Sequence, residues 1–198
     1  SIIAKNKVQT KQFGEMLFAH FGVTGPIILS ASHTVTKLLK KQVEPIIIEI
    51  NLKPALSREV LDKRVQRDFS ESQNKQLVNV LKGLLPSKLI PVICQLAELE
   101  GTKAIHDITK EERLRLVDTI QHMRLTVHKP RPIAEAIVTA GGISVKEVDP
   151  KTMQSKLVHG LYMAGEVLDV DAFTGGYNLQ VAFSTAYVAA THAAEGGV

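Results

Sequence analysis

The sequence contains few of the residues that mark several common classes of protein. Cys94 is the only cysteine among 198 residues, so an internal disulfide is excluded. A single thiol is typical of a protein from a reducing compartment, and we expect a cytoplasmic location. Tryptophan is absent, and aromatic residues make up only 5% of the chain. This scarcity disfavours a base-stacking platform for nucleic acid.

Long hydrophobic runs are also absent. No apolar run approaches the ~20 residues that a membrane helix needs, so no membrane partner is expected. The chain begins SIIAKNKVQTKQ, without the charged-then-apolar order of a signal peptide. It also starts without methionine, from which we expect a fragment or a processed product. Hydrophobic residues make up 44% and charged residues 22%, which is ordinary for a soluble globular protein.

Charge is divided unevenly along the chain. Residues 134–198 contain three lysines and seven acidic residues, whereas the whole chain has a net charge of +4, so residues 1–133 carry +8. Such a division indicates two units with different roles. A solvated helical surface is the ordinary interpretation of the basic half, and a nucleic-acid surface is the alternative. The seven histidines show no metal-ligand spacing, so no metal site is expected.

Hydrophobic spacing and capping residues predict the order of helices and strands. The first part is predicted to be extended at residues 5–21, helical at 26–39 and a strand at 45–52. Residues 57–122 are predicted to form four short helices, which begin at Ser57, Ser72, Ser87 and the capping-box pattern TKEE at 109–112. The last part is predicted to have strands at 124–129, 136–144 and 160–166 and a helix from Tyr177 to about Ala194.

The stretch GLYMAGEVLDVDAFTGGYNLQ, residues 160–180, has the features of a ligand site. Gly165 permits a sharp turn where a Cβ atom would obstruct a ligand, and Glu166 follows at the carboxyl end of the predicted strand, where α/β sheets bind ligands. Gly175 and Gly176 precede a helix whose free N–H groups suit an electron-rich oxygen. The flavin carbonyl beside N1 is such an oxygen, and it gains negative charge on reduction. The alternative is a plain strand–loop–helix crossover with an acidic loop.

Two long stretches resemble a known family. The sequence AIVTAGGISVKEVDPKTMQSKLVHGLYMAGEVLDVDAFTGGYNLQVAFSTAYVAA, residues 136–190, closely resembles the C-terminal part of a family of bacterial NAD(P)/FAD-dependent oxidoreductases. These are the conserved flavoproteins that include aminoacetone oxidases and a bile-acid-inducible flavoprotein reductase. GEMLFAHFGVTGPIIL, residues 14–29, resembles the segment GE-LF-H-G-SGP of the same family. The two stretches occur in the expected order, and the resemblance covers almost the whole chain.

The resemblance implies an α/β fold class, here an α+β fragment. Members have an FAD-binding domain of the glutathione-reductase type, interrupted by an insert with a β-barrel-like part and a small helical subdomain. By this resemblance, residues 1–52 and 123–135 belong to the β-barrel-like part, 53–122 to the helical insert subdomain, and 136–198 to the C-terminal segment of the FAD-binding domain.

One feature of the family is missing from the sequence. Members begin with a βαβ unit that carries G-x-G-x-x-G and seats the FAD pyrophosphate. Gly22 with Gly25, Gly141 with Gly142, and Gly175 with Gly176 all fail this spacing. We therefore expect that the N-terminal FAD-binding half is absent from this chain, and that the chain alone is inactive.

Roles for individual residues follow from the resemblance. Gly165 and Glu166 correspond to a motif that touches the ribityl chain of FAD. Gly176, Tyr177, Asn178 and Leu179 correspond to residues at the pyrimidine edge of the flavin, which they contact mostly through backbone groups. Thr139, Ala140, Gly141 and Gly142 correspond to a loop near the isoalloxazine ring. Asp169 and Asp171 border the same cleft, with solvation of a loop as their alternative role, and no catalytic residue is assigned.

The sequence thus predicts the distal part of an FAD-dependent oxidoreductase that roofs its active site. A small molecule is the expected substrate, NAD(P)H or that substrate is the expected electron donor, and O₂ is a possible acceptor. A second hypothesis is a non-enzymatic basic helical module that binds RNA or a protein. Lys63, Arg64 and Arg67 form a basic helical face that could attract a phosphate of NAD(P)H, although a solvated face is the simpler interpretation. His20 could face substrate, with a structural role as the alternative, and Cys94 is expected to be buried.

Overall fold

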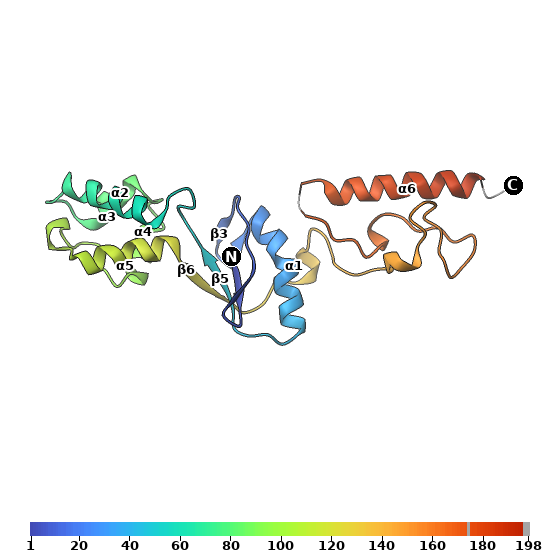
Figure 1. The fold of residues 1–198 in the computed structure, drawn as a ribbon, viewed down its shortest axis with the longest axis horizontal. Coiled ribbons are helices and arrows are strands. Elements are labelled where there is room, and N and C mark those ends of the chain that lie inside the picture. The colour runs from blue at the N-terminus through green and yellow to red at the C-terminus, as the bar shows by residue number, and fades with distance from the viewer. Residues whose placement is uncertain (174, 196–198) are drawn as a thin grey trace. The chain divides into compact units, whose positions relative to one another are not determined.

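The computed structural model describes residues 1–173 and 175–195, and everything below concerns these residues. The fold is mixed α/β, with antiparallel strands and helices (Figure 1). The chain divides into two compact units. The first unit consists of residues 1–8 and 45–127, and the second of residues 9–44 and 128–198. The three-part division based on the family resemblance stays a prediction.

A four-stranded antiparallel sheet forms the base of the first unit. Its strand order is β2-β1-β5-β6, and the strands are β1 (Ile2–Ala4), β2 (Lys7–Thr10), β5 (Ile46–Ile50) and β6 (Met123–Val127). In β1 and β5 the buried residues alternate or stand at the strand ends, since Ile2, Ala4, Ile46 and Ile50 are buried. One face of this sheet is therefore a core face. The predicted strands at 45–52 and 124–129 are confirmed within a few residues.

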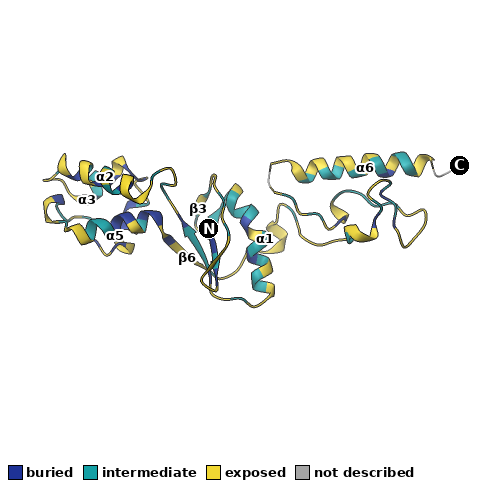
Figure 2. Cartoon of the chain, viewed as in Figure 1, coloured by how far each residue is buried: buried dark blue, intermediate teal, exposed yellow. Residues whose placement is uncertain are grey.

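Four helices lie between β5 and β6 in the sequence. They are α2 (Arg58–Ser70), α3 (Leu77–Val80), α4 (Ile90–Leu96) and α5 (Lys110–Gln121). The helices and the 3-10 turn after α3, Leu81–Gly83, supply most of the fully buried side chains: Leu61, Val65, Leu77, Leu81, Ile93, Leu116, Val117 and Ile120. Buried residues are dark blue in Figure 2. This set is a complete small core that belongs to the helices themselves.

Capping residues fix where two of these helices begin. The Ser57 hydroxyl accepts a hydrogen bond from the Val60 N–H at the start of α2. At α5, Thr109 and Glu112 form both hydrogen bonds of a capping box. Both starts were predicted. The second helix was predicted from Ser72 but begins only at Leu77. The residues before it form turns, one of which is closed by a hydrogen bond of 2.9 Å from the Lys75 N–H to the Ser72 carbonyl.

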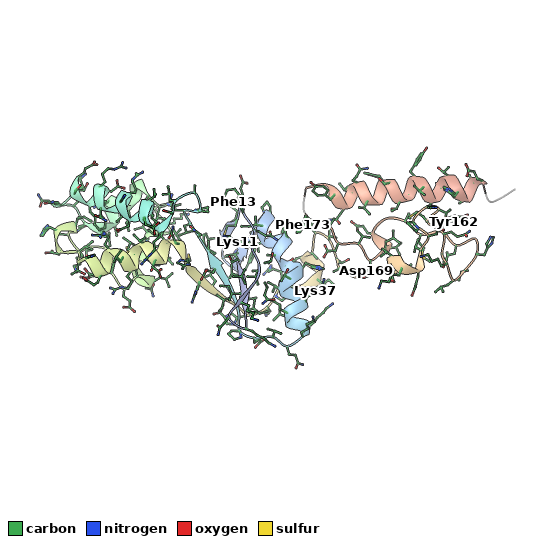
Figure 3. The ribbon with its side chains drawn as sticks, viewed as in Figure 1. Lys11, Phe13, Lys37, Tyr162, Asp169 and Phe173 are labelled. Atoms are coloured by element: carbon green, nitrogen blue, oxygen red, sulfur yellow. The ribbon has the colours of Figure 1, made fainter. Side chains whose placement is uncertain are left out.

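The second unit contains helix α1 (Pro26–Lys40), the hairpin of β3 (Leu17–Ala19) and β4 (Gly22–Thr24), and the long helix α6 (Tyr177–Glu195). A small core beside α6 consists of Val148, Met153, Leu168 and Ala189. Tyr162 packs against this core, and its hydroxyl donates to the His192 carbonyl of α6 at 3.3 Å (Figure 3). The segment before α6 is thereby attached to the helix.

The strands predicted at 136–144 and 160–166 are wrong. A strand needs a continuous ladder of backbone hydrogen bonds with a neighbour. Within the described part of the chain, the first segment makes one parallel bridge, Ile143 with Leu168, and the second makes one antiparallel bridge, Tyr162 with Gln154. Residues Gly165–Val167 instead form a short 3-10 helix, η5. Glu166 therefore lies in a helical turn rather than at a strand end.

Candidate functional site

Two of the loops predicted to contact a flavin are joined directly in the second unit. The Ile143 N–H donates to the Val167 carbonyl at 2.8 Å, and the Asp169 N–H donates to the Ile143 carbonyl at 2.8 Å. The Gly141 N–H donates to Asp169 Oδ1 at 3.1 Å. These three bonds bring Thr139–Gly142 beside η5, although the two segments are separated by more than twenty residues of sequence.

The close approach of these loops requires a glycine at position 142. Gly142 has a φ of +145°, and a Cβ atom there would lie 2.5 Å from the Val167 carbonyl oxygen. Gly141 also has a positive φ, +113°, but an added Cβ would meet nothing within 4 Å. The pair therefore has one closed side, which contacts the chain, and one open side. Bare backbone with open space beside it is a surface that a flat ring can approach closely.

Gly165 and Glu166 are held against α6. The Gly165 N–H donates to the Thr185 hydroxyl at 2.9 Å, and that hydroxyl donates back into α6 at the Val181 carbonyl. Gly165 has a φ of +71°, which favours glycine. Glu166 is exposed, and none of the residues described here gives its carboxylate a partner. This carboxylate is free to accept hydrogen bonds from hydroxyl groups.

The first turn of α6 carries backbone donors. Among residues 1–173 and 175–195, the first helical bond runs from the Gln180 N–H to the Gly176 carbonyl at 3.0 Å. The amides of Tyr177, Asn178 and Leu179 stand before it, in the turn where helix geometry provides no partner. They lie at the positive end of the helix dipole, which favours negative charge. Gly176 has a φ of +89° and no atom within 4 Å of an added Cβ, so the approach to these amides is open.

The side chain of Asn178 has a structural role. Its Oδ1 accepts from the Ala172 N–H at 2.9 Å, and its Nδ2 donates to the Ala172 carbonyl at 3.1 Å. These two hydrogen bonds between side chain and backbone attach the loop before α6 to the first turn of the helix. The side chain of Asn178 is thus occupied, and the backbone role of this residue at the flavin stays a prediction.

Asp169 and Asp171 have partners within the protein. Asp169 accepts from the Gly141 N–H, as described above, and Asp171 Oδ2 lies 2.6 Å from His33 Nδ1 on α1. Both residues are also exposed, and their place beside a flavin cleft stays a prediction. Neither His33 nor Thr185 was singled out in the sequence, because each acts through a contact with a residue that is distant along the chain.

Other candidate residues make none of the contacts described above. The exposed ring of His20 lies edge-on to the Phe21 ring, with centroids 5.1 Å apart, and its role stays a prediction. Cys94 is buried as expected, and burial raises the pKa of its thiol. No group of three or more His, Cys, Asp or Glu residues in the described part of the chain could hold a metal ion. In the same part, none of the helices is both long and apolar enough to cross a membrane.

Taken together, the groups near the start of α6 are chemically suited to a flavin. The amides of Tyr177–Leu179 can donate to an electron-rich pyrimidine carbonyl, and Glu166 can accept from ribityl hydroxyls. The open backbone of Gly141 can lie against a ring. None of these groups is blocked by the internal hydrogen bonds described above.

Comparison with curated proteins identifies three informative relatives. A ribosomal RNA dihydrouridine synthase of Haemophilus influenzae is 34% identical over 178 residues, which is 90% of this chain and 42% of the relative. A ribosomal RNA dihydrouridine synthase of Escherichia coli is 30% identical over 88% of this chain and 41% of the relative. A 3-dehydro-bile acid delta(4,6)-reductase of Clostridium scindens is 29% identical over 96% of this chain and 46% of the relative. The chain thus spans less than half the length of each of these relatives.

A family model covers most of the chain. Residues 1–138 match the model described as HI0933-like protein barrel and H2TH domain. This range contains the antiparallel sheet, the hairpin and the four helices α2 to α5. The mixed α/β fold and the family resemblance seen in the sequence are both confirmed by this match. The chain belongs to the HI0933-like flavoprotein family.

Proposed function

We propose that this chain is the distal part of an FAD-dependent reductase. It would hold the isoalloxazine and ribityl ends of the cofactor, while the dinucleotide-binding half lies in polypeptide outside this chain. The observation that carries the proposal is the direct bonding of the Thr139–Gly142 loop to η5 through Ile143, Val167 and Asp169. Two segments assigned to the flavin by resemblance are thereby neighbours, and both have open backbone.

Each group in this site has a stated task. The amides of Tyr177, Asn178 and Leu179 would donate to the pyrimidine edge, and the helix dipole would favour negative charge there. Glu166 would bind ribityl hydroxyls, and Gly141 and Gly142 would let the ring approach the backbone. When bound, the flavin supplies a hydride that it has taken from NAD(P)H. The protein positions the cofactor and excludes water.

The exposed apolar side chains of α6 favour the proposal that another part of the FAD-binding domain covers this helix. The helix has no Asp, Glu, Lys or Arg before Glu195, and several of its exposed side chains are large and apolar. Leu179, Phe183 and Tyr187 recur every four residues and are 60%, 70% and 75% exposed. A stripe of this kind is typical of a helix that another surface covers.

We propose that residues 136–198 complete an FAD-binding domain with the missing half, that 1–52 and 123–135 form the barrel part, and that 53–122 form the helical insert.

The names of the relatives indicate which class of reduction to propose for this chain. Dihydrouridine is uridine with its ring double bond saturated, and a delta(4,6)-reductase saturates carbon–carbon double bonds. Both reactions add a hydride and a proton across a double bond, with an electron pair that a reduced nicotinamide can supply. We propose the same reaction class here, with a double bond conjugated to a carbonyl, which stabilises the charge that develops on hydride addition.

A uridine of RNA is the first candidate substrate, which differs from our sequence-based expectation against nucleic acid. A steroid-like small molecule is the second, because the bile-acid relative aligns over 96% of this chain.

The test uses the complete protein that contains this chain. We expect purified protein to show the visible absorption band of bound flavin, to be bleached anaerobically by NADH or NADPH, and to form dihydrouridine in deproteinised ribosomal RNA, measured by mass spectrometry of nucleosides. Glu166→Ala should weaken flavin retention without unfolding the protein, whereas Glu147→Ala serves as an exposed-carboxylate control. A protein that stays colourless after incubation with FAD would overturn the proposal and favour a non-enzymatic binding module.

A further inference from the structure

One side of helix α2 combines cationic and apolar groups. Leu56, which precedes the helix, and Val60, Lys63, Arg64 and Arg67 line a surface cavity of about 450 Å³. We call these five residues the α2 face. Their spacing places them on one side of the helix, and the buried side chains of Leu61, Val65 and Phe69 occupy the opposite side. The α2 face therefore points away from the core of the helical insert.

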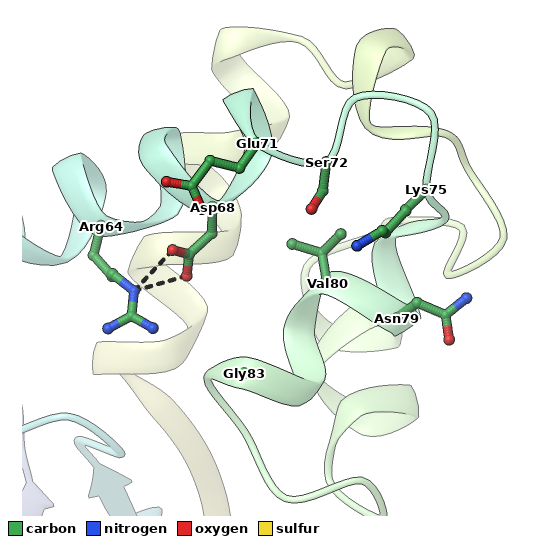
Figure 4. Close-up of a pocket in the computed structure, with 8 residues that line it drawn as sticks. All are labelled: Arg64, Asp68, Glu71, Ser72, Lys75, Asn79, Val80 and Gly83. Carbon is green, nitrogen blue, oxygen red and sulfur yellow. Dashed lines mark hydrogen bonds and ion pairs between the residues drawn. The ribbon is translucent and has the colours of Figure 1, made fainter.

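The acidic residues of α2 are already engaged in bonds inside the helical insert. Asp62 accepts from Arg113 at 2.8 Å and from Gln66 at 2.6 Å. Asp68 accepts two hydrogen bonds from Arg64 Nε, at 2.8 and 2.9 Å, as Figure 4 shows. Glu59 accepts from the Ser57 hydroxyl at 2.8 Å. No acidic residue lines the α2 face itself.

Two cations of the α2 face remain available. The described residues give the Lys63 ammonium neither a hydrogen bond nor an ion pair. The Arg67 guanidinium is 60% exposed and lies 3.6 Å from Asp68, a carboxylate that Arg64 already binds more closely. Lys63 and Arg67 stand one helical turn apart, with Val60, which is 51% exposed, beside them. Two adjacent cations, of which only Arg67 has an ion pair among the described residues, and that a long one, lie beside apolar side chains, an arrangement suited to the phosphates and sugars that alternate along a nucleic-acid strand.

We propose that the α2 face binds the sugar-phosphate backbone of an RNA substrate. This inference rests on the proposed function, because it supplies the RNA contact that a reductase acting on uridine needs outside the flavin site. Backbone contacts fix the position of a nucleic acid without reading its sequence. Lys63 and Arg67 would each neutralise one phosphate, and Leu56 and Val60 would contact the sugars between them. The helical insert thus positions the RNA, and the chemistry remains at the flavin.

The test measures RNA binding by the complete protein. The probe is a fluorescein-labelled hairpin of bacterial ribosomal RNA, and the readout is anisotropy at several salt concentrations. Lys63→Ala/Arg67→Ala should weaken binding about tenfold at moderate salt and reduce the slope of log affinity against log salt by roughly 2, one for each phosphate contact. The matched control, Lys88→Ala/Arg58→Ala, removes the same charge from exposed positions outside the α2 face, Arg58 at the first residue of α2 and Lys88 in the turn before α4. It should bind within twofold of the parent protein.

Several results would overturn the inference. An equal loss in both variants would mean that net charge alone drives binding. Unchanged RNA affinity with a raised KM for NADPH in Lys63→Ala/Arg67→Ala would assign the α2 face to the nicotinamide phosphate instead. Unchanged RNA affinity with loss of a protein partner would make it a protein interface. Flavin content separates this inference from the proposed function, because a yellow parent protein whose Lys63→Ala/Arg67→Ala variant binds RNA as tightly as the parent would refute the α2 face and leave the flavin reductase standing.

Discussion

Replacing Gly142 by alanine tests the hydrogen bonds that hold the Thr139–Gly142 loop against the η5 segment. The new Cβ would lie 2.5 Å from the Val167 carbonyl oxygen and 3.0 Å from the Asp169 nitrogen, so the loops must separate. The backbone bonds at stake are Ile143 N–H to Val167 and Asp169 N–H to Ile143, each 2.8 Å. Two such bonds contribute about 1 kcal/mol each. The positive φ adds a strain of order 1–3 kcal/mol.

The neighbouring glycine supplies a matched control. Gly141→Ala carries a comparable backbone strain, since its φ is +113°, but the added Cβ meets nothing within 4 Å. The difference between the two variants therefore isolates the separation of the loops. We expect this difference to be about 2 kcal/mol, from the two lost hydrogen bonds. This difference refers to the free energy of unfolding of the flavin-free protein, because Gly141 belongs to the proposed flavin surface and its substitution would itself weaken FAD binding.

Two assays on the complete protein decide the matter. Hydrogen exchange followed by mass spectrometry should show faster exchange of the segments around Ile143 and Asp169 in Gly142→Ala, and little change in Gly141→Ala. Urea titration of the flavin-free protein should show the expected difference of about 2 kcal/mol in the free energy of unfolding. Equal exchange and equal stability in the two variants would refute the reasoning, because the clash would then have been relieved without parting the loops.

Three further predictions concern the helical insert. Thr109→Ala removes half of the capping box of α5 and should lower the free energy of unfolding by about 1 kcal/mol in urea titrations. The pKa of Glu112 lies below its usual range because Lys103 donates a hydrogen bond to it, as does the Thr109 backbone. Its stabilising contribution is therefore present above the unfolded pKa of about 4.3 and is lost as pH falls through the lower folded pKa. Glu112→Gln should accordingly destabilise the protein at pH 7 and much less at pH 3, and equal losses at both pH values would contradict this. Because burial covers Cys94 and raises the pKa of its thiol, a thiol reagent at pH 8 should label it slowly in native protein and rapidly in urea.

Local chemistry explains which elements could be predicted from the sequence. The helix starts at Ser57 and Thr109 were found because a cap and the amides it satisfies lie within three residues. Helix α6 was found from its long run of small apolar residues. The strands at 136–144 and 160–166 were wrong because pairing depends on a distant partner, and Ile143 meets only Leu168 there. No local pattern can reveal that a ladder stops after one bridge.

In the candidate site, too, residues in local motifs were found from the sequence and residues that act through distant contacts were missed. The family resemblance directed attention to the glycine loops and to Glu166, and their assignment to FAD stays a prediction. The residues that hold these loops in place were missed. Thr185 bonds Gly165 across 20 residues of sequence, and His33 pairs with Asp171 across 138 residues. Such contacts follow from the packing of the second unit, and neither residue belongs to a motif.

The antiparallel pairing of β5 with β6 makes the helical insert an exchangeable module. The chain leaves the sheet after Ile50 and returns at Met123, and these two residues face each other in the ladder. A further bond from the Leu52 N–H to the Ile120 carbonyl at 3.0 Å closes the exit. Because the two ends meet, and because each doubling of a closed loop costs only about 0.6 kcal/mol, the segment between them can grow, shrink or be replaced while the sheet keeps its register. The helical segment can therefore diverge in evolution without disturbing the sheet from which it emerges.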